Sequence, residues 1–212
     1  MAKLNQTQIA YDRILQDIKD NRLAQGQPIV EEDYAKKINM SRTPVREAIR
    51  LLSVDGFVTL YPRKGAFVKV LTANDISDCY EMMEAIEGMI AFIAAKNPEE
   101  NKVNALKLVL KEMEKYKKRM DFHKWKEKDI EFHRTLHTMC KNQLLIQHWE
   151  KLFQRTYQIQ TSFTTVVDIS EATEEHRMIY QAIVRKDCEA ARRSTQQNWK
   201  RAREDFLKNT KT

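Results

Sequence analysis

The pattern of apolar positions divides the chain into two regions with different expected architectures. In the first region, apolar residues recur at helical spacing over residues 7–21, and two shorter helices are expected at residues 31–38 and from Ser41 onwards. Two β-rich runs, at residues 57–61 and 66–70, flank a basic turn and predict a hairpin. Helix, short helix, tight turn, third helix and hairpin is the order of a winged helix-turn-helix, with the hairpin as its wing.

After residue 72 the pattern changes to long helices without strand signals. Helices are expected at residues 73–96, 99–120, 125–140, 144–164, 170–185 and 187–208. Asn97 is expected to cap the second of these, with Pro98 in its first turn, and Asp187 to cap the last. We therefore predict a mainly α protein, with a winged helix-turn-helix at residues 1–72 and an all-α helical bundle at residues 73–212.

The composition narrows the classes of function. The chain has 212 residues and only four glycines, at positions that form neither of the glycine-rich loops that bind nucleotide phosphates. No apolar run approaches the roughly 18 residues of a membrane-spanning helix, and the first residues do not resemble a secretory leader, so a cytoplasmic protein without a membrane partner is expected. A net charge of +7 favours polyanions as partners.

The start of the third helix carries the candidate chemistry for DNA binding. Arg42 and Arg46 are four residues apart on one helical face, and each guanidinium matches guanine O6 and N7 or a phosphate. Ser41 and Thr43 can cap the helix or donate to phosphate. The alternative is an ordinary solvated basic face. Against it stands the basic turn of the predicted wing, residues 63–65, where Arg63 and Lys64 precede Gly65.

Residues 40–52 (MSRTPVREAIRLL), followed by residues 55–58 and 64–68, resemble the GntR family of bacterial transcription regulators. The resemblance extends over roughly residues 8 to 71. It implies that Arg42, Thr43 and Arg46 contact or position DNA, that Arg50 lies along the DNA backbone, and that Gly65 is the wing tip. Tyr34 stands where the family usually has Leu.

In the second region, Asp129 and His133 are one helical turn apart and can share an ion. Such a pair is more often a surface ion pair, unless the fold brings His176 beside it. His137 continues the same stripe, where a neighbouring or surface position is expected rather than a ligand.

An all-α domain after a GntR-type DNA-binding domain resembles the FadR subgroup with an FCD-type effector domain. The resemblance implies a divalent metal, zinc or nickel, held by Asp129, His133 and His176, with Asn198 at the position of a final His ligand. Asn is a poorer partner for these ions than imidazole. It further implies a small carboxylate effector near the metal. Because Met83 stands where many members have an Arg, Arg155 or Tyr157 is the candidate for binding the effector.

We predict that the protein is a homodimeric, sequence-specific transcriptional regulator, and specifically a repressor. Its expected partners are a double-stranded DNA operator with two-fold symmetry and a small-molecule effector. Two alternatives remain open from the sequence: a metal-independent regulator that binds an apolar or acyl effector, and a metallohydrolase that uses the Asp129, His133 and His176 set.

Overall fold

A computed structural model describes residues 6–162 and 168–209, with side chains placed for residues 6–155 and 168–208. The chain forms two compact units. The first extends to Ile76 and includes a later segment that starts at Gln154, and the second contains the remainder. A long helix begins at Ala73, directly after the domain boundary that the sequence predicts at residue 72. The division between the two compact units lies slightly later, after Ile76.

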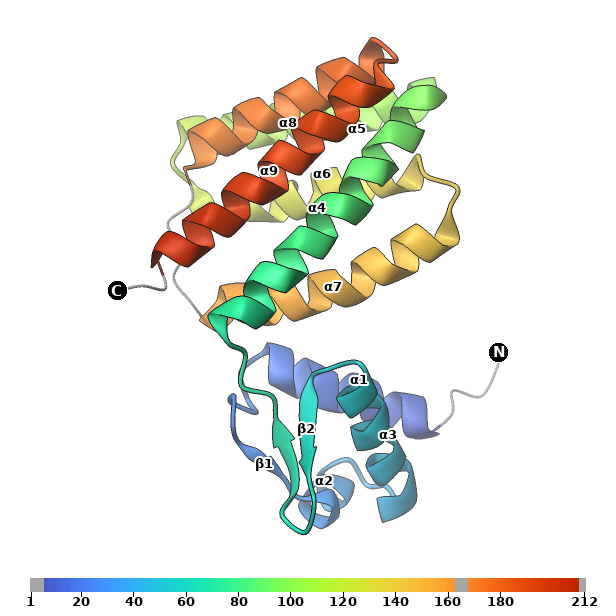
Figure 1. The fold of residues 1–212 in the computed structure, drawn as a ribbon, viewed down its shortest axis with the longest axis vertical. Helices are drawn as coiled ribbons and strands as arrows, with labels where there is room; N and C mark the ends of the chain where they lie inside the picture. Colours follow the sequence, from blue (N-terminus) through green and yellow to red (C-terminus); the bar gives the residue numbers. More distant parts are fainter. Residues whose placement is uncertain (1–5, 163–167, 210–212) are drawn as a thin grey trace. The chain divides into compact units, whose positions relative to one another are not determined.

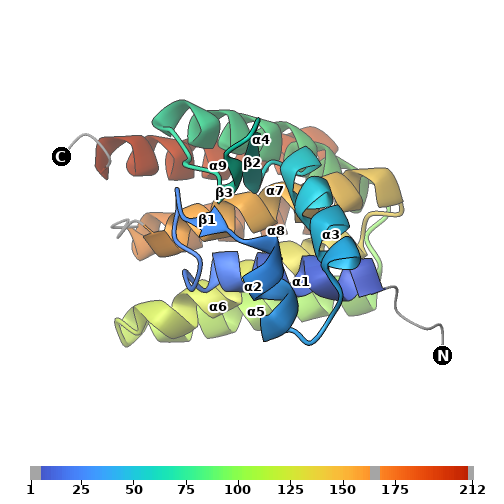
Figure 2. The same ribbon diagram turned by 90° about the horizontal axis from the view of Figure 1, so that it is seen from below.

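The first unit is a winged helix-turn-helix, as predicted (Figure 2). Its sheet is antiparallel with strand order β1-β3-β2, and Tyr61 pairs with Gly65 at the end of the hairpin. The short strand β1 was not expected, because two residues carry no detectable alternation and pair only through a segment nearly 40 positions away. The elements are α1 (Gln6–Lys19), β1 (Pro28–Ile29), α2 (Glu31–Lys37), α3 (Arg42–Val54), β2 (Val58–Tyr61) and β3 (Gly65–Val68).

The tight turn between α2 and α3 depends on local backbone conformation. Asn39 adopts a left-handed conformation with φ 53°, which asparagine tolerates better than most residues. Ser41 is extended, and Pro44 lies in the first turn of α3, where its missing N–H breaks no helical bond. One face of α3 is buried in the core of the unit, through Val45, Ala48, Ile49 and Leu52, so the opposite face is left exposed.

A buried carboxylate connects α1 to α2. The Asp17 side chain has no solvent exposure, and its Oδ1 accepts from Arg22 Nε at 2.6 Å. Its Oδ2 accepts from Lys37 Nζ at 2.7 Å and from the Tyr34 hydroxyl. Tyr34 thus provides a buried ring whose hydroxyl satisfies part of a buried charge.

The second unit is all α-helical, which confirms the predicted fold class (Figure 1). Helix α5 packs against α6 and α8, and α8 packs against α9. Helices α4 and α9 approach closely at Gly88, where an added Cβ would lie 2.8 Å from Gln196 Cγ. The start of α4 and the end of α7 belong to the first unit. The helices are α4 (Ala73–Lys96), α5 (Glu100–Lys118), α6 (Phe122–Thr138), α7 (Gln143–Ser162), α8 (Ile169–Val184) and α9 (Cys188–Asn209).

Two predicted helix starts had different outcomes. Asp187 caps α9 as predicted, since its Oδ1 accepts from the Ala190 backbone N–H at 2.9 Å. The prediction for α5 was wrong: that helix begins at Glu100, after an extended Glu99, so Pro98 lies outside it. A proline without an N–H is tolerated equally well just before a helix. None of the described helices is long and apolar enough to cross a bilayer.

Candidate functional site

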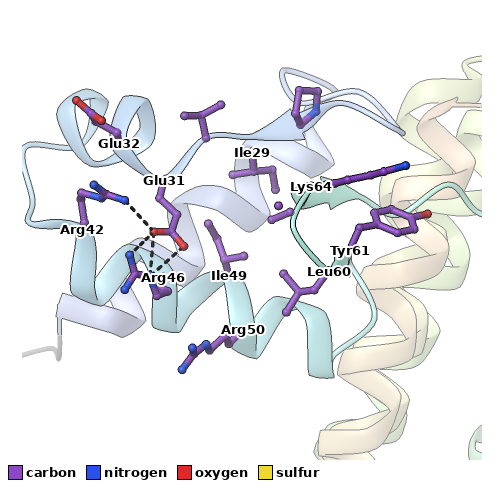
Figure 3. Close-up of a pocket in the computed structure, with 14 residues that line it drawn as sticks. Ile29, Glu31, Glu32, Arg42, Arg46, Ile49, Arg50, Leu60, Tyr61 and Lys64 are labelled. Carbon is purple, nitrogen blue, oxygen red and sulfur yellow. Dashed lines mark hydrogen bonds and ion pairs between the residues drawn. The ribbon is translucent and has the colours of Figure 1, made fainter.

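The exposed face of α3 and the wing surround a concave region of about 640 Å³ (Figure 3). Its walls come from β1, the start of α2, the outward face of α3, and the hairpin. Four basic side chains that the sequence singled out line this region: Arg42, Arg46, Arg50 and Lys64. All four are exposed, so a polyanion can approach them without unfolding any part of the unit.

An ion pair between Arg46 and Glu31 lies within this region (Figure 3). Arg46 Nε donates to Glu31 Oε2 at 2.9 Å, and Arg46 Nη2 lies 2.9 Å from the same oxygen. Arg42 Nη2 is 3.7 Å from that oxygen. The hydrogen bond from Arg46 holds the pKa of Glu31 below its ordinary value, so this carboxylate is charged at neutral pH.

The remaining predicted DNA-binding residues lie at the ends of the same elements. Ser41 is the N-cap residue of α3 but makes no side-chain capping hydrogen bond. Thr43 is exposed in the first turn of α3. At the hairpin turn, Arg63 has φ 63° and Gly65 has φ 97°, with no atom within 4 Å of a Cβ built on Gly65. The wing tip is therefore shaped by left-handed backbone and open on its outer side.

In the second unit, Asp129, His133 and His176 lie together, with one ligand atom from each within 4.8 Å of the others. His176 Nε2 is 3.1 Å from Asp129 Oδ1 and 3.3 Å from His133 Nε2. The histidines are buried, and α6 and α8 supply the three side chains. The fold thus brings His176 beside the Asp129 and His133 pair, which the sequence alone could not establish.

The other ring nitrogens define what these histidines can bind. His176 Nδ1 lies 2.6 Å from the Ala172 carbonyl oxygen, and His133 Nδ1 lies 2.7 Å from Glu87 Oε1. Because a carbonyl or carboxylate accepts, both Nδ1 atoms donate, and in a neutral ring each Nε2 is left with the lone pair that can bind a cation. Donor atoms around a tetrahedral zinc are roughly 3.3 Å apart, so the donor set and its spacing fit a divalent cation.

Glu87 is the residue that the sequence analysis missed. Its side chain has no solvent exposure, and its Oε1 accepts from His133 Nδ1 and lies 2.9 Å from His137 Nε2. Its Oε2 accepts from Trp199 Nε1. His137 therefore takes the neighbouring position expected for it. A detectable signal existed, since Glu87 interrupts the buried apolar stripe of α4 formed by Met83, Ile90 and Ala94.

Burial alone would lower the pKa of His133, because it disfavours the charged ring. The charge of Glu87 and the hydrogen bond to it outweigh burial and raise the pKa of His133 to about 9. Burial would raise the pKa of Glu87, but the two imidazoles lower it. The Glu87 carboxylate thus stays charged, and the protonated, positively charged form of the His133 ring is favoured.

The remaining predicted site residues of the second region are Asn198, Arg155 and Tyr157. Asn198 is buried and its Nδ2 donates to Glu175 Oε2 at 2.7 Å, and Arg201 Nε donates to the same oxygen at 2.9 Å. Arg155 is half-buried, and its guanidinium Cζ would lie 3.2 Å from a Cβ built on Gly56. The Tyr157 side chain lies outside the described residues.

The sequence matches two families of known proteins. Residues 6–68 match the family described as bacterial regulatory proteins, gntR family, and residues 78–201 match the FCD domain. A probable D-xylose utilization operon transcriptional repressor of Paenarthrobacter nicotinovorans is 27% identical over 192 residues, which are 89% of this chain and 84% of that protein. The transcriptional repressor RspR of Escherichia coli is 26% identical over 92% of this chain and 88% of its own length.

Solved structures show the same fold. The Escherichia coli protein McbR/YncC has a TM-score of 0.74 at 16% identity, over 97% of this chain and 99% of its own. A putative GntR regulator from Rhodococcus sp. RHA1 has a TM-score of 0.70 at 20% identity, over 95% and 97% of the two chains. At these identities the likeness concerns the fold alone.

A winged helix-turn-helix with four exposed basic side chains, attached to an all-α domain, defines a DNA-binding transcriptional regulator. The chain belongs to the gntR family of bacterial regulatory proteins and carries an FCD domain. The resemblance seen in the sequence is thereby confirmed. The metallohydrolase alternative was wrong, because the family and the relatives are regulators and not enzymes.

Proposed function

We propose that this protein is a sequence-specific repressor whose DNA contacts come from α3 and the wing. The observation that carries the proposal is the clustering of Arg42, Arg46, Arg50 and Lys64 around one concave region, beside the face of α3 that is exposed in the first unit. In this arrangement Arg42 and Arg46 contact base edges from the start of α3. Ser41, Thr43, Arg50, and Arg63 with Lys64 contact phosphates on either side.

The protein acts as a homodimer on an operator with two-fold symmetry. A single α3 covers only a few base pairs, and a second copy doubles the length of sequence that is contacted. A regulator of this class acts where the DNA is, which in a bacterium is the cytoplasm. Gel shifts with the DNA upstream of the protein's own gene, over a range of salt concentrations, test the proposal. It fails if no complex survives at a salt concentration that dissociates random DNA.

Replacing single basic residues distinguishes their roles. Arg46→Ala is expected to weaken binding to the selected site more than to random DNA, since a base contact is worth about 1–3 kcal/mol. Lys64→Ala is expected to weaken both about equally and to reduce the salt dependence. Equal losses in Arg46→Ala would assign Arg46 to a phosphate instead.

For the second unit we propose a divalent cation, zinc or nickel, held by Asp129, His133 and His176. Support comes from the Nε2 atoms of His133 and His176, which lie 3.3 Å apart. Each carries a lone pair for a cation when its ring is neutral and protonated on Nδ1. A bound cation would supply open coordination positions for a small carboxylate effector. Glu87 then holds His133 in the orientation and tautomer that direct Nε2 to the cation.

Elemental analysis of untagged protein, prepared without chelators, tests this part beside the variant Asp129→Ala. About one ion per chain that is lost in the variant supports the metal-anchored sensor. The absence of an ion from both proteins would favour the other candidate, in which the domain binds an apolar or acyl effector without metal. The departures at Met83 and Asn198 from the family pattern keep that candidate in the test.

A further inference from the structure

The Arg46 guanidinium is engaged on one edge only. Arg46 Nε donates to Glu31 Oε2 at 2.9 Å and to Oε1 at 3.1 Å, and Nη2 lies 2.9 Å from Oε2. These contacts use the side of the fork that contains Nε. The end of the fork, with Nη1 and the second hydrogen of Nη2, faces away from Glu31 and can still pair with guanine O6 and N7 (Figure 3).

The position of Glu31 is itself fixed by the fold. It is the first residue of α2, where the free N–H groups of the helix favour a negative charge. It lies directly after the β1 residue Ile29 and the N-cap Val30, so the pairing of β1 with the wing determines where α2 begins. The carboxylate that holds Arg46 is therefore anchored to the backbone that also carries the wing.

The neighbouring acidic residue behaves differently and provides an internal comparison. Glu32 also lines the concave region, but its carboxylate pairs with Lys36 Nζ at 2.9 Å, one turn along the same helix. Its side chain is 56% exposed, against 28% for Glu31. Glu31 and Glu32 thus carry the same charge on neighbouring residues of the same concave region, but it is Glu31 that contacts an arginine of α3.

We propose that Glu31 is a specificity-determining positioning residue: it holds Arg46 ready for a base and keeps α3 from binding phosphate indiscriminately. This inference rests on the proposed DNA contacts of α3. An arginine without such a partner can turn toward any phosphate, which every sequence offers. The Glu31 carboxylate repels phosphate and restricts the Arg46 side chain. Because Arg46 is already ordered in the free protein, less conformational entropy is lost when it binds DNA.

The experiment compares Glu31→Ala with the matched control Glu32→Ala, which changes the net charge by the same amount. Two duplexes serve as probes: one selected by the wild-type protein from a random-sequence pool, and a scrambled duplex of equal length and composition. Glu31→Ala is expected to weaken binding to the selected duplex about tenfold and to strengthen binding to the scrambled one. Glu32→Ala is expected to shift both affinities in the same direction, which leaves their ratio unchanged.

A double-mutant cycle makes the inference specific to the contact. In an Arg46→Ala background, Glu31→Ala should no longer change the ratio of the two affinities. An unchanged ratio in Glu31→Ala alone, or an equal loss in Glu32→Ala, would overturn the inference while leaving DNA binding by α3 intact. If the wild-type protein bound both duplexes equally, the proposed function itself would fail, and the two failures are therefore distinguishable.

Discussion

Each compact unit contains a carboxylate with no solvent exposure, and the two are neutralised in different ways. In the first unit, Asp17 is paired with Lys37 and Arg22, whose side chains are nearly half exposed, at 47% and 48%. In the second unit, Glu87 is paired with His133 and His137, both only 5% exposed. The positive charges around Asp17 are permanent near neutral pH, whereas those around Glu87 depend on protons or a cation.

The difference indicates which carboxylate is suited to regulation. The Asp17 network keeps the same charge over the physiological pH range, so it fixes α2 against α1 throughout that range. The Glu87 network includes His133, whose Nε2 lies beside Asp129 and His176. The charge of the His133 ring, and with it the net charge around Glu87, therefore changes when a proton or a cation binds at Nε2. Four changes would break or sharpen this comparison.

The largest effect is expected for Glu87→Ala. Removing one partner from a buried charged network costs about 3–5 kcal/mol, because the remaining polar groups lose their partner without gaining water. All three tryptophans of the chain, at positions 125, 149 and 199, belong to the second unit, so their fluorescence during urea unfolding reports that unit. Asp17→Ala is the control and should leave the tryptophan transition in place. A transition in Glu87→Ala equal to that of the wild type would refute a structural role for the network.

A smaller effect is expected from acid in the first unit. Burial would raise the pKa of Asp17, but hydrogen bonds from Lys37, Tyr34 and Arg22 outweigh it and lower the pKa from 3.8 to about 2. A lowered folded-state pKa stabilises the fold above the unfolded value, and this stabilisation is lost as pH falls from about 4 to about 2, amounting to about 2 kcal/mol. Amide hydrogen exchange of α1 and α2 measures it. Asp17→Asn should reduce this part of the acid dependence, and an identical pH profile would contradict the assignment.

Asn198→His is expected to strengthen metal binding about tenfold, since an imidazole is a better ligand than an amide oxygen for zinc or nickel. A histidine here could donate Nδ1–H to Glu175, as Asn198 Nδ2 now does, and direct Nε2 elsewhere. Competition with a chelator of known affinity measures the change. Gln197→His, one residue earlier and exposed, is the matched control. Equal effects of the two substitutions would show that position 198 lies outside the site.

The smallest effect is expected for Tyr34→Phe, about 1 kcal/mol, because it removes one of three donors to Asp17 and keeps the buried ring. Hydrogen exchange of α2 detects the loss. Tyr61→Phe, on the exposed wing, serves as the control. A loss as large as that from Asp17→Ala would mean that the permanent charges of Lys37 and Arg22 do not stabilise Asp17 by themselves.

Local periodicity was sufficient to predict the helices, the wing and the exposed arginines of α3. It was sufficient because these features depend on residues close in sequence, such as the buried face of α3 and the basic turn before Gly65. The contacts that organise both candidate sites join distant segments: Arg46 with Glu31, and Glu87 with His133 and Trp199. Such pairs leave no periodic trace, and Glu87 was detectable only as a charge within an apolar stripe.

The close approach of α4 and α9 depends on Gly88, and it affects the neighbouring hydrogen bond between Trp199 and Glu87. Gly88 follows Glu87 on α4, and the Cβ it lacks would collide with Gln196 on α9, three residues before Trp199. A larger residue at position 88 would force the Gln196 side chain to move or the two helices to separate. The interaxial distance that Gly88 permits therefore determines whether the indole of Trp199 can reach the Glu87 carboxylate.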